Sequence, residues 1–480
     1  MLLSRASYYF SYNFLIVFLS SLVFKAFPLH GDERPNFVVI LCDDLGYGDI
    51  SCYGNKIIKT PNIDRLASQG IRFTDYYSPS PVCSPSRVGL LTGRTPNRAG
   101  IYDWIPSGTQ FHLEEKEFTI PKMLKRAGYA TCMSGKWHCN GKFNKKSQPQ
   151  PGDFGFDHWF ATQNNAAPSH RNPKNFVRNG EGVGELEGFS CRIVAEEANR
   201  WIENHVIENP DQPFFTFIAF HEPHEPISSP ESMISNYPNA QKKGEALYYA
   251  NVENMDFAVG MIMDCLNRNK VAENTLVIFT SDNGPETLNR YGGAWRSHGS
   301  PGDLRGMKLH THEAGIRVPG VMRWPLQIKA GQVSDEPVNS LDLMPTFANL
   351  AAGEIPIDIQ LDGTDIVNAF GKDEVIRKRP MFWCYYSALN KSKVALRDGN
   401  WKLLASLKSK NDKYLKIRSL NKSNYDLIKT ARLVDFELYN IGNDNDESLN
   451  LVDKNHDEFK RLSEAMRMMF DEVLKDSKIW

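Results

Sequence analysis

The chain has 480 residues, of which 24% are charged and 41% are hydrophobic, and its formal net charge is −1. These values are typical of a soluble globular protein with two or three domains. The balanced charge argues against a nucleic-acid partner, because neutralising phosphates requires an excess of Lys and Arg.

The N-terminus is the first distinct segment. Arg5 precedes an apolar run at 14–24, and Lys25 follows it. The run is shorter than the ~20 residues that a membrane-spanning helix needs, and it matches the core of a secretory signal. We therefore expect residues 1–31 to be a signal peptide, with an uncleaved N-terminal anchor as the alternative. The mature protein is then expected to be secreted or periplasmic, without stable membrane insertion.

Residues 32–370 are expected to form an α/β domain. Apolar, β-branched runs at 37–42, 214–220 and 275–280 are typical of strands buried on both faces of a parallel sheet, and 129–133 reads as a further strand. Helices are expected at 62–69, 120–126, 191–206 and 246–267. This alternation predicts an α/β fold with a mixed, mostly parallel central sheet sandwiched by helices.

Polar residues follow each of the four predicted strands. In chain order they are Asp43-Asp44, Lys136-Trp137-His138, His221-Glu222-Pro223-His224 and Asp282-Asn283. In open α/β sheets the ligand crevice lies beyond the carboxyl ends of the strands, so we expect these residues to converge there. A solvated loop would explain any one of these groups, but it does not explain why all four carry chemically active side chains.

The converging acidic residues predict a metal site. Asp43, Asp44, Asp282 and Asn283 offer only oxygen ligands, which suit a hard cation such as Ca²⁺ or Mg²⁺. Three clustered carboxylates would raise at least one carboxyl pKa by mutual repulsion unless a cation neutralised them. Calcium fits better than magnesium because so many protein ligands are available. The alternative to a metal site is that these acidic residues only cap helices and form Asx turns. Zinc bound by thiolates is not expected, since the eight cysteines form no C-x-x-C.

A set of cations and hydrogen-bond donors is expected around this metal. Its members are Arg87, Lys136, His138, His224 and Lys308. Such a set suits the anionic, tetrahedral transition state of a sulfate or phosphate ester. Each residue taken alone could equally be a surface lysine or a structural histidine.

The C-terminal part has a different pattern. Shorter segments at 393–397 and 401–404 replace the long alternation, and a Lys-, Asn- and Ser-rich stretch at 406–429 is expected to be an exposed insertion. Apolar residues at helical spacing predict a terminal helix at 458–474. We expect residues 371–480 to form a smaller α+β domain.

One short motif identifies a chemistry. Cys83 stands in the pattern Cys-x-Pro-x-Arg, followed by Leu-Thr-Gly-Arg at 91–94, although a lone cysteine can also be a small buried hydrophobe. With this motif and those at 35–49, 60–67, 135–138, 281–285 and 315–319, the chain resembles the type I sulfatases of the alkaline-phosphatase-like superfamily over nearly its whole mature length.

The resemblance implies a modified nucleophile. A formylglycine-generating enzyme would convert Cys83 to formylglycine (3-oxoalanine), whose hydrate attacks sulfur. This residue would bind calcium together with Asp43, Asp44, Asp282 and Asn283. Arg87 would hold the hydrate, and Lys136 and Lys308 would hold sulfate oxygens.

The resemblance also implies two proton-transfer residues. His138 would take the proton from the second hydroxyl so that sulfate is expelled, and His224 would protonate the leaving oxygen. His221 precedes a similar Glu-Pro and is the alternative acid or a substrate contact. Around Lys308 the chain departs from the family's glycine-rich stretch, so His310 and His312 are expected to shape its own substrate pocket.

The expected substrate is a sulfated carbohydrate, within a polysaccharide or glycosaminoglycan-type oligosaccharide. Aromatic and basic residues of variable loops would stack on sugars and bind further anions; these are Trp104, His158, Trp159, Arg171 and Trp295. Two alternatives remain: a phosphodiesterase or phosphonate monoester hydrolase of the same fold, and a non-enzymatic homologue that binds carbohydrate or calcium.

Overall fold

The computed structural model describes residues 34–287, 290–371 and 374–480. The segment predicted to be a signal peptide, residues 1–31, lies outside the described residues. Across the described ranges, no helix combines the length and the apolar character that a membrane crossing requires.

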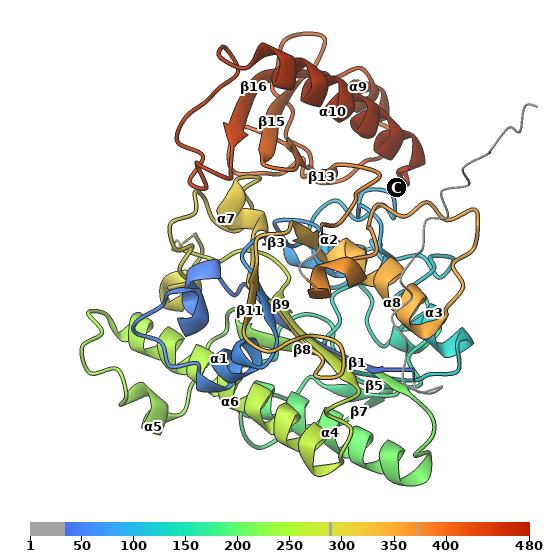
Figure 1. The fold of residues 1–480 in the computed structure, drawn as a ribbon, viewed down its shortest axis with the longest axis vertical. Helices are drawn as coiled ribbons and strands as arrows, with labels where there is room; N and C mark the ends of the chain where they lie inside the picture. Colours follow the sequence, from blue (N-terminus) through green and yellow to red (C-terminus); the bar gives the residue numbers. More distant parts are fainter. Residues whose placement is uncertain (1–33, 288–289, 372–373) are drawn as a thin grey trace, which may run out of the picture. The chain divides into compact units, whose positions relative to one another are not determined.

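A mixed sheet forms the centre of the fold (Figure 1). Its strands are β1 (Asn36–Asp43), β2 (Ile71–Phe73), β4 (Ala130–Lys136), β5 (His158–Thr162), β6 (Val177–Arg178), β7 (Glu181–Gly182), β8 (Phe214–Pro223), β9 (Thr275–Ser281), β10 (Gly320–Arg323) and β11 (Gln332–Ser334). They lie in the order β11-β2-β10-β9-β1-β8-β4-β5-β6-β7. The five central strands, from β9 to β5, are parallel, whereas β10, β6 and β7 are antiparallel to their neighbours. The predicted mixed, mostly parallel sheet is confirmed.

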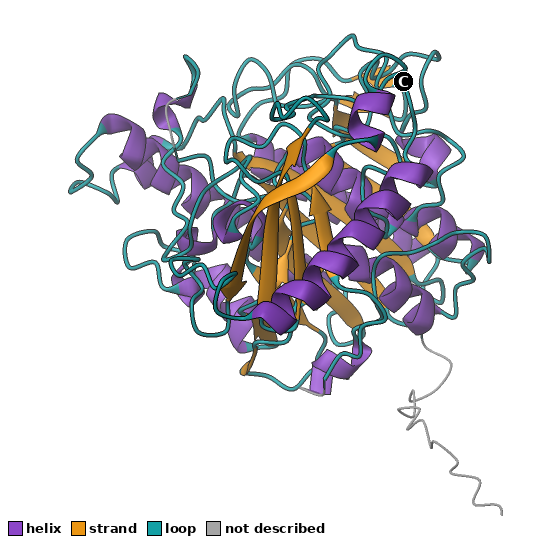
Figure 2. Cartoon of the chain, turned by 90° about the horizontal axis from the view of Figure 1, so that it is seen from above, coloured by secondary structure: helices purple, strands orange, loops and turns teal. Residues whose placement is uncertain are grey.

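Helices cover both faces of this sheet (Figure 2). One face carries α1 (Pro61–Ser68), α4 (Ser190–Glu208) and α6 (Lys243–Arg268), and the other carries α2 (Cys83–Thr92), α3 (Ile120–Arg126) and α8 (Leu343–Ala351). Side chains alternate along a strand, so a strand buried on both faces must be apolar throughout. In β1, Val38 and Ile40 pack with α4 and α6, while Phe37 and Val39 pack with α2, α3 and α8.

A second, antiparallel sheet follows in the chain. It consists of β13 (Met381–Cys384), β14 (Val394–Asp398), β15 (Trp401–Lys408) and β16 (Arg432–Asn440), paired in that order. The terminal helix α10 (His456–Asp476) packs on β14 and β15, and its buried Leu462 and Phe470 share a hydrophobic cluster with the sheet. The smaller C-terminal α+β part is thereby confirmed, whereas the domain boundary at residue 370 stays a prediction.

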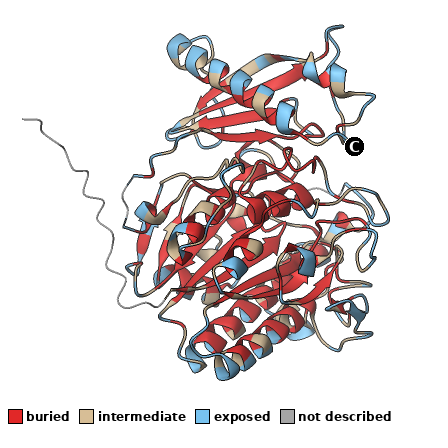
Figure 3. Cartoon of the chain, turned by 90° about the vertical axis from the view of Figure 1, so that its right-hand side faces the viewer, coloured by how far each residue is buried: buried red, intermediate tan, exposed pale blue. Residues whose placement is uncertain are grey.

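The stretch at 406–429, which was expected to be an exposed insertion, is exposed at 410–414 and at several later residues but is anchored by buried ones. Strand β15 continues to Lys408, and Leu415, Leu420 and Ile428 are buried in the same cluster as α10. Isolated apolar residues between lysines and asparagines carry no periodic signal, so their burial depends on tertiary packing. Figure 3 shows the buried residues running along both sheets.

The remaining strands and α-helices are short. They are β3 (Tyr76–Tyr77) paired with β12 (Val338–Asn339), and the helices α5 (Glu231–Ile234), α7 (Glu313–Ile316) and α9 (Tyr425–Lys429).

Candidate active site

The carboxyl ends of four parallel strands meet at one edge of the central sheet. Leu41 of β1 pairs with Ala219 of β8 and with Thr280 of β9, and Ala219 also pairs with Gly135 of β4. The residues that follow these positions are therefore neighbours in space. They include Asp43 and Lys136, the last residues of their strands, and Asp282, His224 and His138, which follow just beyond. The predicted convergence of these residues is what the structure shows.

Helix α2 brings the motif cysteine to this edge. Cys83 is its first residue, every residue of the helix is buried, and Gly93 ends it in the left-handed conformation at φ 66°. No helix was predicted here, because an entirely buried helix has no polar face to create a 3.6-residue pattern. Burial raises the pKa of the Cys83 thiol to about 11. As an unmodified cysteine it would therefore be a protonated, weakly nucleophilic thiol at neutral pH.

Arg87 lies one helical turn after Cys83 and joins the two sides of the site. Its Nε donates to Oδ2 of Asp282 over 2.9 Å, and its Nη1 donates to the carbonyl oxygen of Lys136 over 2.8 Å. The Nζ of Lys136 lies 2.5 Å from Oδ2 of Asp43. The side chains of Arg87, Asp282, Lys136 and Asp43 are fully buried or nearly so. Each charge therefore needs its partner, because an unpaired buried charge strongly destabilises the fold.

Asp44 is the centre of a second group. Its backbone adopts a left-handed conformation, with φ 66°, directly after β1 ends at Asp43. Lys308 Nζ lies 2.7 Å from its Oδ1, and Asn283 Nδ2 donates to the same oxygen over 2.7 Å. His224 Nε2 lies 3.6 Å from Oδ2.

The acidic group fits an oxygen-coordinated cation. Buried Oδ1 atoms of Asp43 and Asn283 have no hydrogen-bond partner among the described residues, and ligand atoms of Asp43, Asp44 and His224 lie within 4.8 Å of one another. Burial and the charge of Asp43 raise the pKa of Asp282 to about 7, a cost that a divalent cation would offset.

Burial lowers the pKa values of two histidines in the site, so both are neutral at neutral pH. His138 Nε2 lies 3.1 Å from the carbonyl oxygen of Ile105, so Nε2 carries the hydrogen, and the buried Nδ1 has no partner among the described residues. Burial and the neighbouring Lys136 hold the pKa of His138 well below its usual value. His224 Nδ1 donates to the carbonyl oxygen of Glu225 over 2.6 Å, and burial lowers the pKa of His224 to about 4.

A cavity of about 680 Å³ opens onto these groups. Cys83, His138, His224 and Lys308 line it, and its other lining residues are Val82, Trp104, Asn164, Asn165, Glu225, Pro226, Arg290, Tyr291, Gly293, Arg296 and Leu309. Arg87, Lys136 and the acidic residues are buried and do not line the cavity, but Asp44 is paired with Lys308, which does.

Several predicted substrate residues lie elsewhere. His221 does not line the cavity; strand β8 continues through Pro223, and His221 Nε2 lies 2.8 Å from Thr162 Oγ1 in the interior. His310 and His312 pack against each other with ring centroids 5.8 Å apart and do not line it either. Arg171 is exposed outside it. Trp104, which was also predicted to bind substrate, does line the described cavity.

The C-terminal part contributes to the site a residue that was not predicted. Tyr385, which follows β13, is buried against Val82 and Cys83, and its hydroxyl donates to Asp103 Oδ1 over 2.9 Å. The cavity residues Asn164, Asn165, Arg290 and Arg296 were not predicted either. Arg296 ends a short 3-10 helix (Ala294–Arg296), and the others lie in loops, in which no spacing rule marks a residue as part of the site.

Comparisons with known proteins agree with this geometry. The sequence profile of the sulfatase family matches residues 35–354, and a profile described as N-sulphoglucosamine sulphohydrolase, C-terminal, matches residues 307–416. The N-acetylgalactosamine-6-sulfatase of Rattus norvegicus is 34% identical over 73% of this chain and 68% of its own. The steryl-sulfatase of Homo sapiens is 30% identical over 70% of each chain.

A solved structure is also similar. The crystal structure of Ps i-CgsB in complex with k-i-k-neocarrahexaose superposes with a TM-score of 0.76 at 29% identity, covering 93% of this chain and 94% of that chain.

Proposed function

This chain belongs to the sulfatase family and is a sulfuric ester hydrolase, and we propose that it removes sulfate from a sulfated carbohydrate, using a formylglycine made from Cys83 and a bound calcium ion. The prediction of an enzyme is thereby confirmed, and the alternative of a non-enzymatic homologue is set aside. The nature of the substrate, the modification and the metal make up the proposal.

Polar side chains in the cavity wall are the observation that carries the choice of a carbohydrate. They belong to Asn164, Asn165, Glu225, Arg290 and Arg296. A ligand rich in hydroxyl groups can both donate hydrogen bonds to such amide and carboxylate groups and accept them from the guanidinium groups. The apolar ring system of a steroid cannot do so, although a steryl-sulfatase is among the relatives.

The relatives support the same choice. One is named for a sulfated amino sugar, and the similar solved structure contains an oligosaccharide. The exposed Trp104 at the cavity rim supplies an aromatic face of the kind on which sugar rings stack.

Residues around the cavity would supply the nucleophile and the positive charge that the reaction needs. Oxidised to formylglycine, Cys83 supplies a hydrated aldehyde whose hydroxyl attacks sulfur. Asp43, Asp44, Asp282 and Asn283 would hold calcium, which supplies positive charge to the sulfate oxygens. Lys308 and Lys136 add positive charge at the same place.

Proton transfer falls to the two histidines. His138 is neutral with a free Nδ1, so it can accept the proton whose loss expels sulfate and restores the aldehyde. His224 lines the cavity and has its Nδ1 hydrogen bonded to the Glu225 carbonyl oxygen, so it would act in its protonated form and give the Nε2 proton to the sugar oxygen as the sulfur–oxygen bond breaks. Water then replaces the hydroxyl consumed, and the net reaction is hydrolysis of the ester.

Maturation and export belong to the proposal as well. The intact Cys-x-Pro-x-Arg motif supports recognition by a formylglycine-generating enzyme, and the apolar run at 14–24 supports secretion or transfer to the periplasm.

A substrate screen tests this function. The protein, produced together with a formylglycine-generating enzyme, is assayed for sulfate release from defined sulfated mono- and disaccharides, an aryl sulfate and a steroid sulfate. An aryl phosphodiester tests the alternative of a phosphodiesterase or phosphonate monoester hydrolase. We expect the highest kcat/KM on a sulfated sugar. Faster cleavage of the steroid sulfate or the phosphodiester than of every sulfated sugar would reject the proposal.

A further inference from the structure

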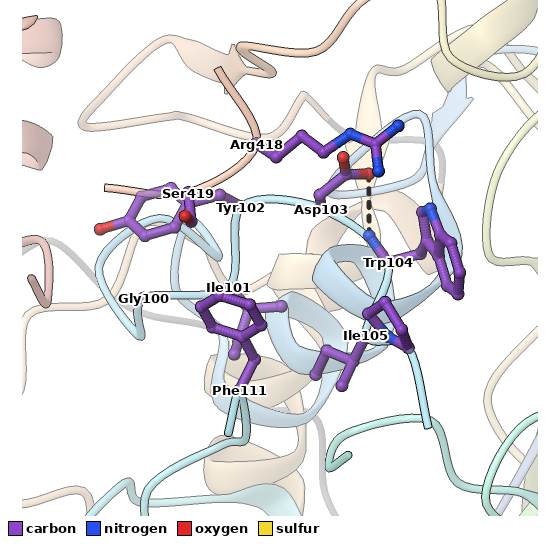
Figure 4. Close-up of a pocket in the computed structure, with 10 residues that line it drawn as sticks. Gly100, Ile101, Tyr102, Asp103, Trp104, Ile105, Phe111, Arg418 and Ser419 are labelled. Carbon is purple, nitrogen blue, oxygen red and sulfur yellow. Dashed lines mark hydrogen bonds between the residues drawn. The ribbon is translucent and has the colours of Figure 1, made fainter. Parts of the chain in front are cut away.

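A second, smaller cavity adjoins the catalytic cavity at Trp104, which lines both (Figure 4). It measures about 150 Å³, and its other lining residues are Gly100, Ile101, Tyr102, Asp103, Ile105, Pro106, Phe111, Arg418 and Ser419. Pockets that hold a whole small ligand usually measure about 300–1,000 Å³. This outer cavity therefore suits one ring or substituent of a molecule that also occupies the catalytic cavity.

The wall of the outer cavity combines aromatic and charged groups. Trp104 and Phe111 provide aromatic surface, and Figure 4 shows the guanidinium of Arg418 extending beside the carboxylate of Asp103. Asp103 Oδ1 accepts hydrogen bonds from the Trp104 amide and from Tyr385. Burial raises the pKa of Asp103, and the positive charge of the nearby Arg418 acts in the opposite direction. Arg418 is exposed, and its guanidinium faces Asp103 without a hydrogen bond to it. A guanidinium has five donors, so Arg418 can bind an anion while it stays beside Asp103.

The segment that separates the two cavities is held in place from both sides. On the catalytic side, the Ile105 amide donates to Ser84 Oγ over 3.0 Å, and the Ile105 carbonyl oxygen contacts His138. On the outer side, Trp480 Nε1 donates to the Gly100 carbonyl oxygen over 2.7 Å. A preformed wall costs little ordering on binding, and this wall is tied directly to the catalytic residues.

We propose that the outer cavity is a subsite for the sugar unit next to the sulfated one, and that Arg418 binds an anionic substituent, a carboxylate or a sulfate, on that unit. This inference rests on the proposed function as a carbohydrate sulfatase. An aromatic wall packs against the apolar face of a sugar ring. An exposed guanidinium is suited to planar carboxylates and to sulfate oxygens, which it can bind through two parallel hydrogen bonds.

The test compares substrates that differ only in the neighbouring unit. The sulfated monosaccharide hydrolysed fastest in the screen above is compared with its disaccharides, whose neighbouring unit is neutral, carboxylated or sulfated, in both linkage directions. Wild-type enzyme is compared with Arg418→Gln. The matched control is Lys416→Gln, since Lys416 is an exposed cation two residues away that lines neither cavity.

Arg418→Gln is expected to lower kcat/KM about fivefold to tenfold for both kinds of anionic disaccharide, mainly through KM. The monosaccharide and the neutral disaccharide should change less than about twofold, and Lys416→Gln should leave all of them unchanged. A loss confined to one anion would identify which substituent Arg418 binds.

Two results would overturn the subsite. One is an equal loss on all substrates, which would make Arg418 a structural residue, and the other is no loss on either anionic disaccharide. In both cases the wild-type enzyme still hydrolyses the monosaccharide, so the proposed function survives. Failure of the wild-type enzyme on every sulfated sugar would instead reject the proposed function.

Discussion

Arg87 Nε donates to Asp282 Oδ2 over 2.9 Å, and Arg87 Nη2 lies 2.7 Å from the same oxygen, with both side chains fully buried. This contact fixes the helix that carries Cys83 against the end of β9, which carries two of the proposed metal ligands. The position of the nucleophile and the position of the metal are thus set by one ion pair.

Replacing Arg87 by Lys should therefore impair both catalysis and stability. Lysine keeps the charge but cannot reach Asp282 and the Lys136 carbonyl oxygen together. We expect kcat to fall at least about 100-fold and the free energy of unfolding to fall by about 2–4 kcal/mol, measured by steady-state kinetics and urea denaturation. Arg65→Lys is the control, because Arg65 makes an exposed contact of 3.8 Å with Asp264. A variant within tenfold of wild-type kcat would refute this role.

Removing the metal should abolish activity reversibly. Dialysis against a calcium chelator is expected to lower kcat, because three carboxylates then lose their common counter-ion, and added Ca²⁺ should restore it better than Mg²⁺. Calcium should also raise the melting temperature, since it binds only the folded site. Unchanged activity in protein shown by elemental analysis to be free of metal would contradict the proposed calcium site.

The role of His224 as an acid predicts a dependence on the leaving group. His224→Ala should lower kcat on a sugar sulfate about 100-fold or more and lower it much less on an aryl sulfate, because a phenolate leaves without full protonation. His138→Ala should impair both substrates alike. His221→Ala serves as the control for the alternative acid, and it should not change the ratio of the two rates. An equal loss on both substrates with His224→Ala would assign the acid elsewhere.

A buried group in the C-terminal part predicts how stability depends on pH. Lys402 Nζ lies 2.7 Å from Glu313 Oε1 and 2.9 Å from Glu447 Oε1, so one cation serves two carboxylates. Burial raises the pKa of Glu447 to about 7, whereas Lys402 overcomes the effect of burial at Glu313 and lowers its pKa to about 2. The folded protein therefore retains a proton on Glu447 that the unfolded chain releases near pH 4.5.

This proton makes the free energy of unfolding fall as the pH rises from about 4.5 to 7. Glu447→Gln cannot ionise, so between pH 5 and 7.5 it should lose about 2–3 kcal/mol less stability than wild type. Urea denaturation at both pH values measures this difference. The surface variant Glu458→Gln should follow the wild-type profile. Parallel pH profiles for Glu447→Gln and wild type would show that Glu447 is ionised in the folded protein.

Much of the fold could be predicted because its central strands are buried on both faces. β1, β8 and β9 are continuous apolar runs, and any strand in that environment must have such a sequence. The short strands β2, β10 and β11, which continue the sheet beyond β9, were not predicted, because segments of three or four residues carry no measurable period.

The site, like the fold, could be predicted in part. Asp43, Lys136 and Asp282 follow strand ends, and topology alone brings such positions together. The sequence favoured His224 over His221 only by the resemblance to the family's motif, since the burial of His221 depends on β8 continuing three residues beyond its apolar run. Tyr385 reaches Cys83 from a separate sheet, and only tertiary structure reveals that contact.

The central claim, that Cys83 becomes formylglycine and performs sulfate transfer, is tested most directly by mass spectrometry of the tryptic peptide 73–87 from active protein. Conversion of the thiol to the aldehyde lowers the peptide mass by roughly 18 Da, and we expect sulfatase activity to scale with the fraction converted. Full activity in protein whose peptide carries only the unmodified thiol would contradict the account.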